Sequence, residues 1–172
     1  MVDEKVLMKI LNSREERARK QKELLDTYNS TLISFTLNIP GREKDNDLYR
    51  KIHKKGFQEI IKEVSKRDIE LVYKEEIDKS TGREAYILVD MEPLKLKDIT
   101  INIEESHPLG RIFDIDVFDR QGKQISRSDL KAEPRKCLLC NKEVRLCMRE
   151  KNHSYEELIL AIRELGQKHL KR

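Results

Sequence analysis

Two aspartates near the middle of the chain stand one residue apart in an otherwise apolar segment. Asp114 and Asp116 belong to the run Gly110-Arg-Ile-Phe-Asp-Ile-Asp-Val-Phe118, which is rich in residues that favour strands. Because alternate side chains of a strand share a face, the two carboxylates lie on one half-buried side, where like charges repel each other. A divalent cation between them would remove that repulsion, so the pair predicts a Mg²⁺ site for phosphoryl transfer. The plain alternative is a pair of solvated acids on an edge strand.

Several basic residues are placed where they could bind an anion. Gly110 and Arg111 precede the acidic pair in a turn, where backbone N–H groups and a guanidinium can face a phosphate. Arg14 and Arg17 fall on the inward line of an amphipathic helix, where apolar residues would be expected. The planar guanidinium suits phosphate oxygens, so these residues are candidate substrate contacts. A surface ion pair is the alternative for any one of them.

Three cysteines and a histidine form a second constellation closer to the C-terminus. Cys137 and Cys140 have Cys-x₂-Cys spacing, and Cys147 and His153 follow them. The four side chains suit a tetrahedral Cys₃His site, so we expect a structural zinc in a Cys/His-rich subregion spanning 135–153. Three buried structural cysteines are the alternative. A redox Cys-x₂-Cys is disfavoured because no βαβ pattern surrounds it.

The composition is that of a globular protein with little surplus charge. A chain of 172 residues is long enough for a proper core, and we expect one domain over 1–172. The net charge of +4 and the aromatic content of 5% argue against a nucleic-acid partner. No apolar run approaches the ~18–20 residues of a membrane span, and the first residues lack signal-peptide features. The sequence therefore predicts a cytoplasmic protein without membrane contact.

Hydrophobic periodicity predicts the elements that position these residues. The pattern indicates an α+β fold, with a mixed sheet packed by helices from both ends of the chain. The segment 93–105 alternates like a strand but carries charges that suit an exposed helix. We favour the helix, because a long connection suits a following strand that pairs into the middle of the sheet. Gly56 is a weak point of the second helix. We expect helices over 3–28, 45–66 and from 154 onwards, strands over 31–39, 69–77, 84–90 and 112–118, and a short return over 123–125.

Two further polar features occur on the predicted strands. Ser34, Thr36 and Asn38 form the small polar face of the strand 31–39, which either lines a pocket or packs under a helix. Asp90 ends an apolar strand and either caps the next helix or supplies a third metal ligand. We favour the cap.

Several motifs occur together along nearly the whole chain. They are Ser13-Arg-Glu-Glu-Arg17, Ser30-Thr-Leu-Ile-Ser-Phe-Thr-Leu-Asn-Ile-Pro-Gly41, Glu84-Ala-Tyr86, His107-Pro-Leu-Gly-Arg-Ile-Phe-Asp-Ile-Asp-Val117, Ile125-Ser-Arg127 and Arg135-Lys-Cys-Leu-Leu-Cys140 with Cys147 and His153. In this combination the chain resembles the holo-acyl-carrier-protein synthases of citrate lyase, also called apo-citrate lyase phosphoribosyl-dephospho-CoA transferases. The combination is far more specific than any one motif.

The resemblance implies a nucleotidyl-type transfer. Such an enzyme takes 2′-(5″-triphosphoribosyl)-3′-dephospho-CoA and a serine of the apo-acyl carrier protein of citrate lyase, forms a phosphodiester and releases pyrophosphate. Asp114 and Asp116 would then hold Mg²⁺, and Arg127 and Arg135 would join the arginines of the first helix as candidate contacts to the triphosphate. The likeness of this chemistry to that of nucleotidyltransferases suggests their fold by analogy.

Two other functions stay open at this point. The same chemistry on another carrier protein, such as that of malonate decarboxylase, would use the same site residues. A non-enzymatic zinc-containing module that binds RNA or protein would need tight, salt-sensitive binding, and the small net charge counts against it.

Overall fold

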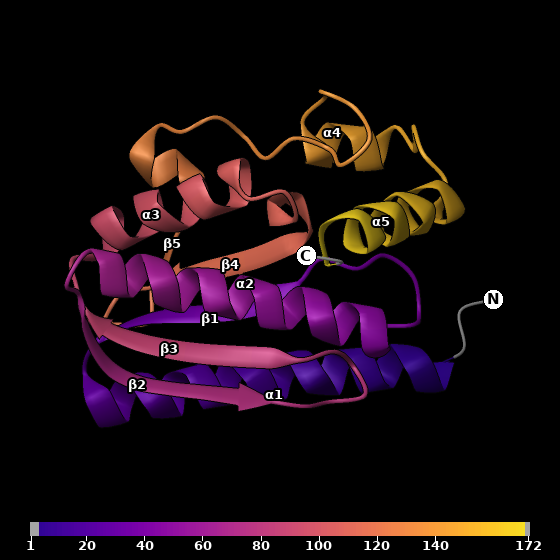
Figure 1. Cartoon of the computed structure of the whole chain (residues 1–172). Helices are drawn as coiled ribbons and strands as arrows, with labels where there is room; N and C mark the ends of the chain where they lie inside the picture. Colours follow the sequence, from indigo (N-terminus) through magenta and orange to yellow (C-terminus); the bar gives the residue numbers. More distant parts are fainter. Residues whose placement is uncertain (1–3, 171–172) are drawn as a thin grey trace.

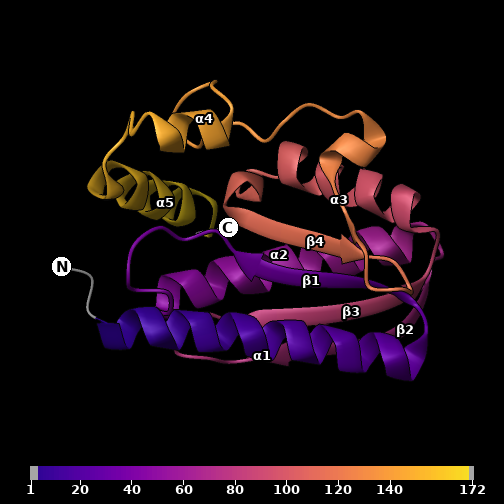
Figure 2. The same ribbon diagram turned by 180° about the vertical axis from the view of Figure 1, so that it is seen from behind.

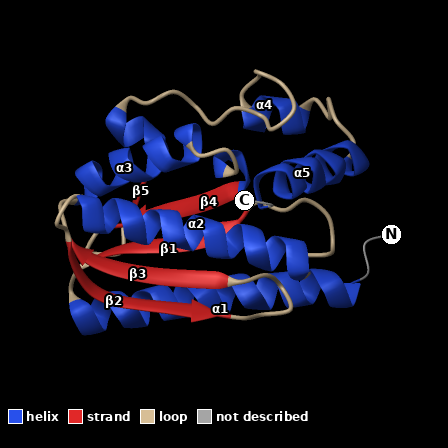
Figure 3. Ribbon diagram, viewed as in Figure 1, coloured by secondary structure: helices blue, strands red, loops and turns tan. Residues whose placement is uncertain are grey.

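The computed structural model describes residues 4–170, which form a five-stranded sheet with helices on both faces (Figures 1 and 3). The predicted α+β class is confirmed. In this part of the chain no helix has the length and apolar character needed to cross a bilayer. The strands are β1 (Thr31–Leu37), β2 (Glu70–Ile77), β3 (Glu84–Asp90), β4 (Phe113–Phe118) and β5 (Gln124–Ile125). The helices are α1 (Glu4–Tyr28), α2 (Asp47–Lys66), α3 (Pro93–Ser106), α4 (Val144–Arg149) and α5 (Tyr155–Leu170), with short 3₁₀ helices at Gly110–Ile112 and Arg127–Leu130.

Every strand pairing is antiparallel, whereas a mixed sheet was expected. Helix α2 connects β1 to β2 and α3 connects β3 to β4, so the strands of each pair run in the same direction. In the strand order β2-β3-β1-β4-β5, β3 lies between β1 and β2, and β1 lies between β3 and β4. Each strand therefore bonds only to antiparallel neighbours, as in a split βαβ, or ferredoxin-like, motif. The nucleotidyltransferase-like fold stays an analogy from the chemistry.

Each face of the sheet carries an apolar cluster, and the two clusters differ in size. On one face α2, α3 and α5 cover the main apolar core, which includes Phe35 and Phe113 (Figure 1). On the other face α1 packs through Leu24 and Leu25 against a smaller apolar cluster around Tyr86. Figure 2 shows that α1 runs along this face and leaves β4 uncovered. The α1 side of the sheet is thus apolar at one end and open beside β4.

Helix α2 lies unusually close to the sheet. Its N-cap is Asn46, whose side-chain oxygen accepts from the backbone N–H of Tyr49 at 2.9 Å. Gly56, which the sequence marked as a weak point, stands over β1, where an added Cβ would lie 2.4 Å from the ring of Phe35. The missing side chain is therefore what permits the close approach, and it brings His53 on the same helix against β1.

The outer edge of β4 is closed mainly by side chains, because β5 pairs only with the last two residues of β4. Lys97 Nζ donates to the carbonyl of Ile115 at 3.0 Å, and the N–H of Ile115 donates to Glu104 Oε1 at 3.2 Å. Arg135 donates to the carbonyl of Phe113. These bonds fix the strand that carries the two aspartates.

The segment 93–105 is helical, as favoured from the sequence, but its cap was predicted wrongly. Pro93 occupies the first turn of α3, so the residue directly before it caps the helix: the Glu92 carboxylate accepts two backbone N–H bonds, at 3.1 and 2.9 Å. Asp90 instead accepts from Arg120 at 2.8 Å. Strand register places Asp90 at the opposite end of the sheet from Asp114, away from a shared metal site.

Most predicted boundaries agree with the structure to within two residues. The strand predicted over 31–39 ends at Leu37, and the short return is the strand Gln124–Ile125. Position 3, where the first helix was predicted to begin, lies outside the described residues, as does the end of the basic tail.

Candidate active site and metal centre

Asp114 and Asp116 project from the same face of β4, as predicted. The pairing of β1 with β4 sets Thr36 opposite Asp114 and Ser34 opposite Asp116. Thr36 Oγ1 donates to Asp114 Oδ2 at 3.4 Å, and Gln124 Nε2 donates to Asp116 Oδ1 at 2.7 Å. These neighbours are neutral hydrogen-bonding groups, which orient the carboxylates without cancelling their charge.

The surroundings of Asp116 disfavour its charged form. Burial, followed by the negative charge of Asp114, raises the pKa of Asp116 from its ordinary value of 3.8 to about 6. The buried ammonium group of Lys97 acts in the opposite direction but does not outweigh them. A carboxylate that is costly to ionise gains more from a bound cation than a solvated acid does.

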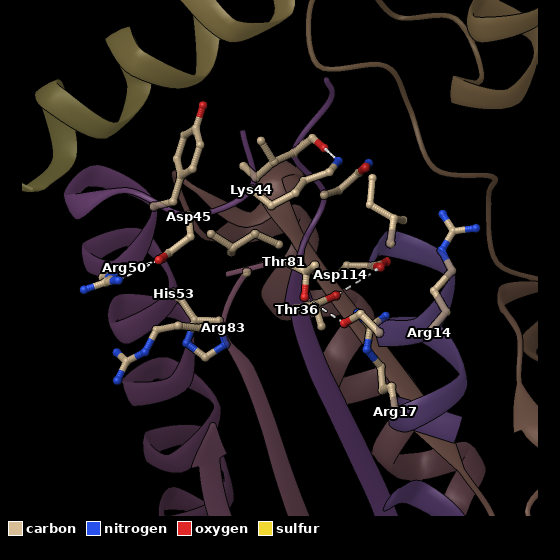
Figure 4. A pocket seen from close by; sticks show the side chains of 17 residues that line it. Arg14, Arg17, Thr36, Lys44, Asp45, Arg50, His53, Thr81, Arg83 and Asp114 are labelled. Atoms are coloured by element: carbon tan, nitrogen blue, oxygen red, sulfur yellow. Dashed lines mark hydrogen bonds and ion pairs between the residues drawn. The ribbon is translucent and has the colours of Figure 1, made fainter. Parts of the chain in front are cut away.

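A polar cavity of about 160 Å³ opens beside Asp114 (Figure 4). Its walls come from α1, the end of β1, the beginning of α2 and the turn between β2 and β3. The predicted polar face of β1 contributes Thr36 and the following Asn38 to this lining, whereas Ser34 accepts from Gln21 of α1 at 2.9 Å. The cationic residues of the lining are Arg14, Arg17, Lys44, Arg50 and Arg83.

Both candidate arginines of the first helix, Arg14 and Arg17, lie at this cavity. Glu84, only 1% exposed, accepts from Arg17 Nε at 2.9 Å and so orients that guanidinium. Burial alone would raise the pKa of Glu84, but the hydroxyl of Tyr86 and the charge of Arg17 outweigh it and hold that pKa below its usual range. Arg14 is exposed and lies on the same wall as Arg17 (Figure 4). The structure therefore brings these two candidates to the cavity that Asp114 lines.

Arg127 and Arg135 lie instead at the outer edge of β4. Arg127 donates to Glu104 at 2.6 Å and to Glu105 at 2.7 Å. Arg135 is bonded to the backbone of β4, and its Nη1 lies 3.6 Å from Asp114 Oδ1. Both guanidinium groups are thus engaged within the protein, and neither lines the cavity.

Gly110 and Arg111 also have contacts within the protein. A Cβ on Gly110 would lie 2.3 Å from the carbonyl oxygen of Glu104, so only glycine fits against the end of α3. Arg111 Nη1 donates to the carbonyl of Cys137 at 2.6 Å. The turn before β4 therefore joins the strand to α3 and to the cysteine cluster.

The four predicted zinc ligands come together in space. One ligand atom each from Cys137, Cys140, Cys147 and His153 lie within 4.8 Å of one another, and the sulfurs of Cys140 and Cys147 are 3.9 Å apart. Ligands bound tetrahedrally to zinc at ~2.0–2.3 Å are separated by about 3.3–3.8 Å. The backbone N–H of Leu139 also faces Cys137 Sγ at 3.5 Å, an arrangement that stabilises a thiolate. The cluster thus fits a structural zinc.

Local structure explains how these ligands converge. A β-bridge between Lys136 and Glu143 closes the Cys-x₂-Cys turn, α4 carries Cys147, and the turn after α4 supplies His153. The subregion packs beside α3 and α5 (Figure 1).

Comparison with known proteins identifies the family. The family model described as CitX, apo-citrate lyase phosphoribosyl-dephospho-CoA transferase, matches residues 5–169. The chain belongs to this family. "Protein CitXG" of Haemophilus influenzae is 35% identical over 160 residues, which are 93% of this chain and 34% of that protein, so the chain spans about a third of its length. Apo-citrate lyase phosphoribosyl-dephospho-CoA transferases of Shigella boydii and Escherichia coli O157:H7 are 34% identical over 150 residues, 87% of this chain and 82% of theirs. The resemblance seen in the motifs is confirmed.

Part of the cavity in this transferase-family chain comes from residues that no sequence pattern marked. Lys44, Arg50, His53 and Arg83 line it, yet none was a candidate. Lysine and arginine near helix starts and turns are common surface residues, so nothing in the sequence distinguished Lys44, Arg50 and Arg83. His53 could have been noticed, because it interrupts the apolar inward face of the predicted helix 45–66.

Proposed function

We propose that this protein transfers the 2′-(5″-phosphoribosyl)-3′-dephospho-CoA group from its triphosphate precursor to a serine of the apo-acyl carrier protein of citrate lyase. Family membership and the names of the relatives support the transferred group and the acceptor. The observation that carries the proposal for this chain is that Asp114 belongs both to the acidic pair and to the basic cavity. Polyphosphate transfer requires cationic side chains and metal-binding carboxylates to lie close together.

The transfer breaks one phosphorus–oxygen bond and forms another. The serine oxygen of the carrier bonds to the α-phosphorus of the donor, while the bond from that phosphorus to the next bridging oxygen breaks. The electron pair of the broken bond leaves with pyrophosphate, and the serine proton passes to solvent. The nucleophile is on the partner, so this chain has to bind, align and neutralise the donor.

The acidic pair and the first helix supply these groups. Asp114 and Asp116 would hold Mg²⁺, which when bound neutralises phosphate charge and stabilises the departing pyrophosphate. The two carboxylates share the face of the sheet on which Ser34 contacts α1. Figure 2 shows that α1 leaves β4 uncovered on this face, where a large donor and a carrier protein can approach. Arg14 and Arg17 bind phosphate oxygens from the α1 wall, and Glu84 fixes the direction of Arg17.

The remaining basic candidates support the site from outside. The contacts of Arg111, Arg127 and Arg135 favour a role in holding β4 against α3 and the cysteine cluster over direct binding of the donor. A zinc ion on the Cys₃His cluster would have four protein ligands and no open position, which is typical of a structural site.

Modification of the carrier tests the proposal. Purified protein, the triphosphate donor and apo-carrier protein are incubated with and without Mg²⁺, and the mass gained by the carrier is followed by intact-protein mass spectrometry. Asp114→Asn and Asp116→Asn should each lower the rate at least ~100-fold, because each removes one carboxylate charge from the metal site.

Asp90→Asn, at the far end of the sheet, is the matched control and should retain the wild-type rate. Full activity in either site variant would refute the metal assignment. Preferential modification of the malonate decarboxylase carrier over that of citrate lyase would refute the acceptor.

A further inference from the structure

The cavity beside Asp114 contains a buried polar group that the protein leaves unsatisfied. His53 is 1% exposed and lines the cavity. No group within residues 4–170 makes a hydrogen bond of normal distance and angle with either ring nitrogen, although the Phe35 backbone lies near enough to favour the charged form. The carboxylate of Glu76 comes to 3.6 Å from its Nδ1, which is too long for a hydrogen bond. Stacking on Phe35, with ring centroids 4.5 Å apart, fixes the imidazole in this place. Burying such a group without a full hydrogen bond is unfavourable, and a hydrogen-bonding ligand would remove that cost.

His53 is neutral at physiological pH. Burial, followed by the positive charge of Arg83, lowers the pKa of His53 from 6.5 to about 4. A neutral imidazole has one N–H donor and one acceptor nitrogen. It can therefore donate to an anionic oxygen among arginines without adding to their mutual repulsion.

The positive charge of the lining is only partly balanced by acids. Arg50 and Arg83 each pair with an aspartate. Lys44 donates to a backbone carbonyl, and burial followed by the nearby charge of Arg14 lowers the pKa of Lys44. Two cations that destabilise each other across an open cavity would both gain from an anion placed between them.

We infer that this cavity is the subsite for the pyrophosphate end of the donor, with His53 bonded to a phosphate oxygen and the surrounding cations balancing its charge. The inference rests on the proposed transfer reaction. Figure 4 shows Arg14 and Arg17 on one side of the cavity and His53 and Arg83 on the other, with Asp114 between them. Cations on opposite walls suit two linked phosphates better than a single one.

The size of the cavity supports a compact occupant. Its volume of about 160 Å³ is well below the ~300–1,000 Å³ of pockets that enclose drug-sized ligands. It can hold the polyphosphate end of the donor, while the dephospho-CoA portion lies outside, along the open side of β4 (Figure 2). The reacting α-phosphorus then lies on the Asp114 side, and the leaving group lies on the His53 side.

Calorimetric titration with sodium pyrophosphate in EDTA tests the subsite apart from catalysis. The wild type should bind pyrophosphate at least ~10-fold more tightly than orthophosphate, because two phosphates meet more of the cations. His53→Leu removes both ring nitrogens and should weaken pyrophosphate binding about 10-fold, whereas His53→Gln keeps a donor and should recover part of that loss. Arg14→Ala, at an exposed position, should also weaken it about 10-fold. Arg120→Ala, beside Asp90 at the far end of the sheet, is the control and should bind as the wild type.

Equal affinity for pyrophosphate and orthophosphate would overturn the inference, as would unchanged pyrophosphate affinity in Arg14→Ala and His53→Gln. The latter two variants decide the question if His53→Leu does not fold. Transfer to the carrier without selective pyrophosphate binding would reject the subsite and leave the proposed function standing. Selective pyrophosphate binding with no carrier modification would reject the proposed function and leave a polyphosphate site.

Discussion

The two sides of β4 differ in how their polar groups are satisfied. At the outer edge, Glu104 accepts from Arg127 and from the strand backbone, and Lys97 donates to that backbone. On the cavity side, His53 lacks a partner among the described residues, and burial together with a neighbouring carboxylate raises the pKa of Asp116. The polar groups at the edge satisfy one another, whereas those on the cavity side would be satisfied only by a bound ligand.

This difference separates residues that look alike in the sequence. Arg14 and Arg127 were both candidates for binding the triphosphate. The first is exposed at the cavity, and the second is 15% exposed and bonded to two glutamates. We therefore expect substitutions at the edge to reduce stability, and substitutions at the cavity to reduce ligand binding and activity at little cost in stability.

The largest effect is expected from loss of zinc beside the edge. Cys140→Ser should remove bound zinc and unfold the subregion 135–153, because structural zinc sites in small modules contribute about 10 kcal/mol or more of folding free energy. Zinc content by plasma mass spectrometry and cleavage within 135–153 by limited proteolysis would measure this. Met148→Ala, a 72% exposed position on α4, is the control and should keep both zinc and protease resistance. Zinc-free wild-type protein with an intact subregion would contradict the structural role.

A smaller loss is expected from breaking the ion pair at the edge. Arg127→Ala should lower the free energy of unfolding by about 3–5 kcal/mol, because it leaves the nearly buried Glu104 without its closest cation. Arg14→Ala should change it by less than about 0.5 kcal/mol. Urea unfolding of the two variants provides the comparison. Equal losses would show that the two arginines do not differ as proposed.

The unpartnered histidine predicts a loss of stability in acid. Its pKa is about 4 in the folded chain against an ordinary 6.5, so below pH 6.5 the unfolded chain binds a proton that the folded chain does not. Wild-type stability should therefore fall relative to His53→Gln by up to about 3 kcal/mol between pH 7 and pH 4. Urea unfolding at several pH values measures this. Parallel pH profiles for the two proteins would exclude a buried neutral imidazole.

The smallest effect is a gain in stability on the cavity side. The pKa of Asp116 is about 6 in the folded chain and 3.8 ordinarily, so the folded chain holds this proton more tightly than the unfolded chain. The folded state is therefore destabilised as the pH rises from about 4 to 6 and the proton is lost. Asp116→Asn should therefore stabilise the protein in EDTA at pH 7.5 by about 1–3 kcal/mol, while abolishing transfer. At pH 4 the gain should disappear. A destabilised variant at pH 7.5 would show that the carboxylate has a structural partner instead.

Much of the fold could be predicted because its determinants are local. Alternation and helical periodicity located the main strands and helices, and the need for a long connection correctly favoured a helix over 93–105. The antiparallel order could not be predicted in this way, because it depends on β3 inserting between β1 and β2, a choice made by contacts far apart in the chain. Gly56 was likewise misjudged from helix propensity alone, because only a residue without a side chain leaves room for the ring of Phe35.

The candidate site was predicted unevenly for a related reason. The pairs Asp114/Asp116 and Cys137/Cys140 are each set by spacing within one short segment, and the structure keeps both pairs together. The cavity is assembled from four segments besides β4, so no spacing rule linked His53 to the first helix. The sequence indicated the candidate arginines, but it could not show which of them form ion pairs within the protein.

The closed edge of β4 also bears on how the protein behaves when it is concentrated. A strand edge with free N–H and C=O groups can recruit a strand from another molecule and start aggregation. Lys97, Glu104 and Arg135 occupy backbone groups of β4 that the two-residue β5 cannot reach. The strand that bears the aspartates can thus stay uncovered on one face for a large partner without offering its edge to a neighbouring copy.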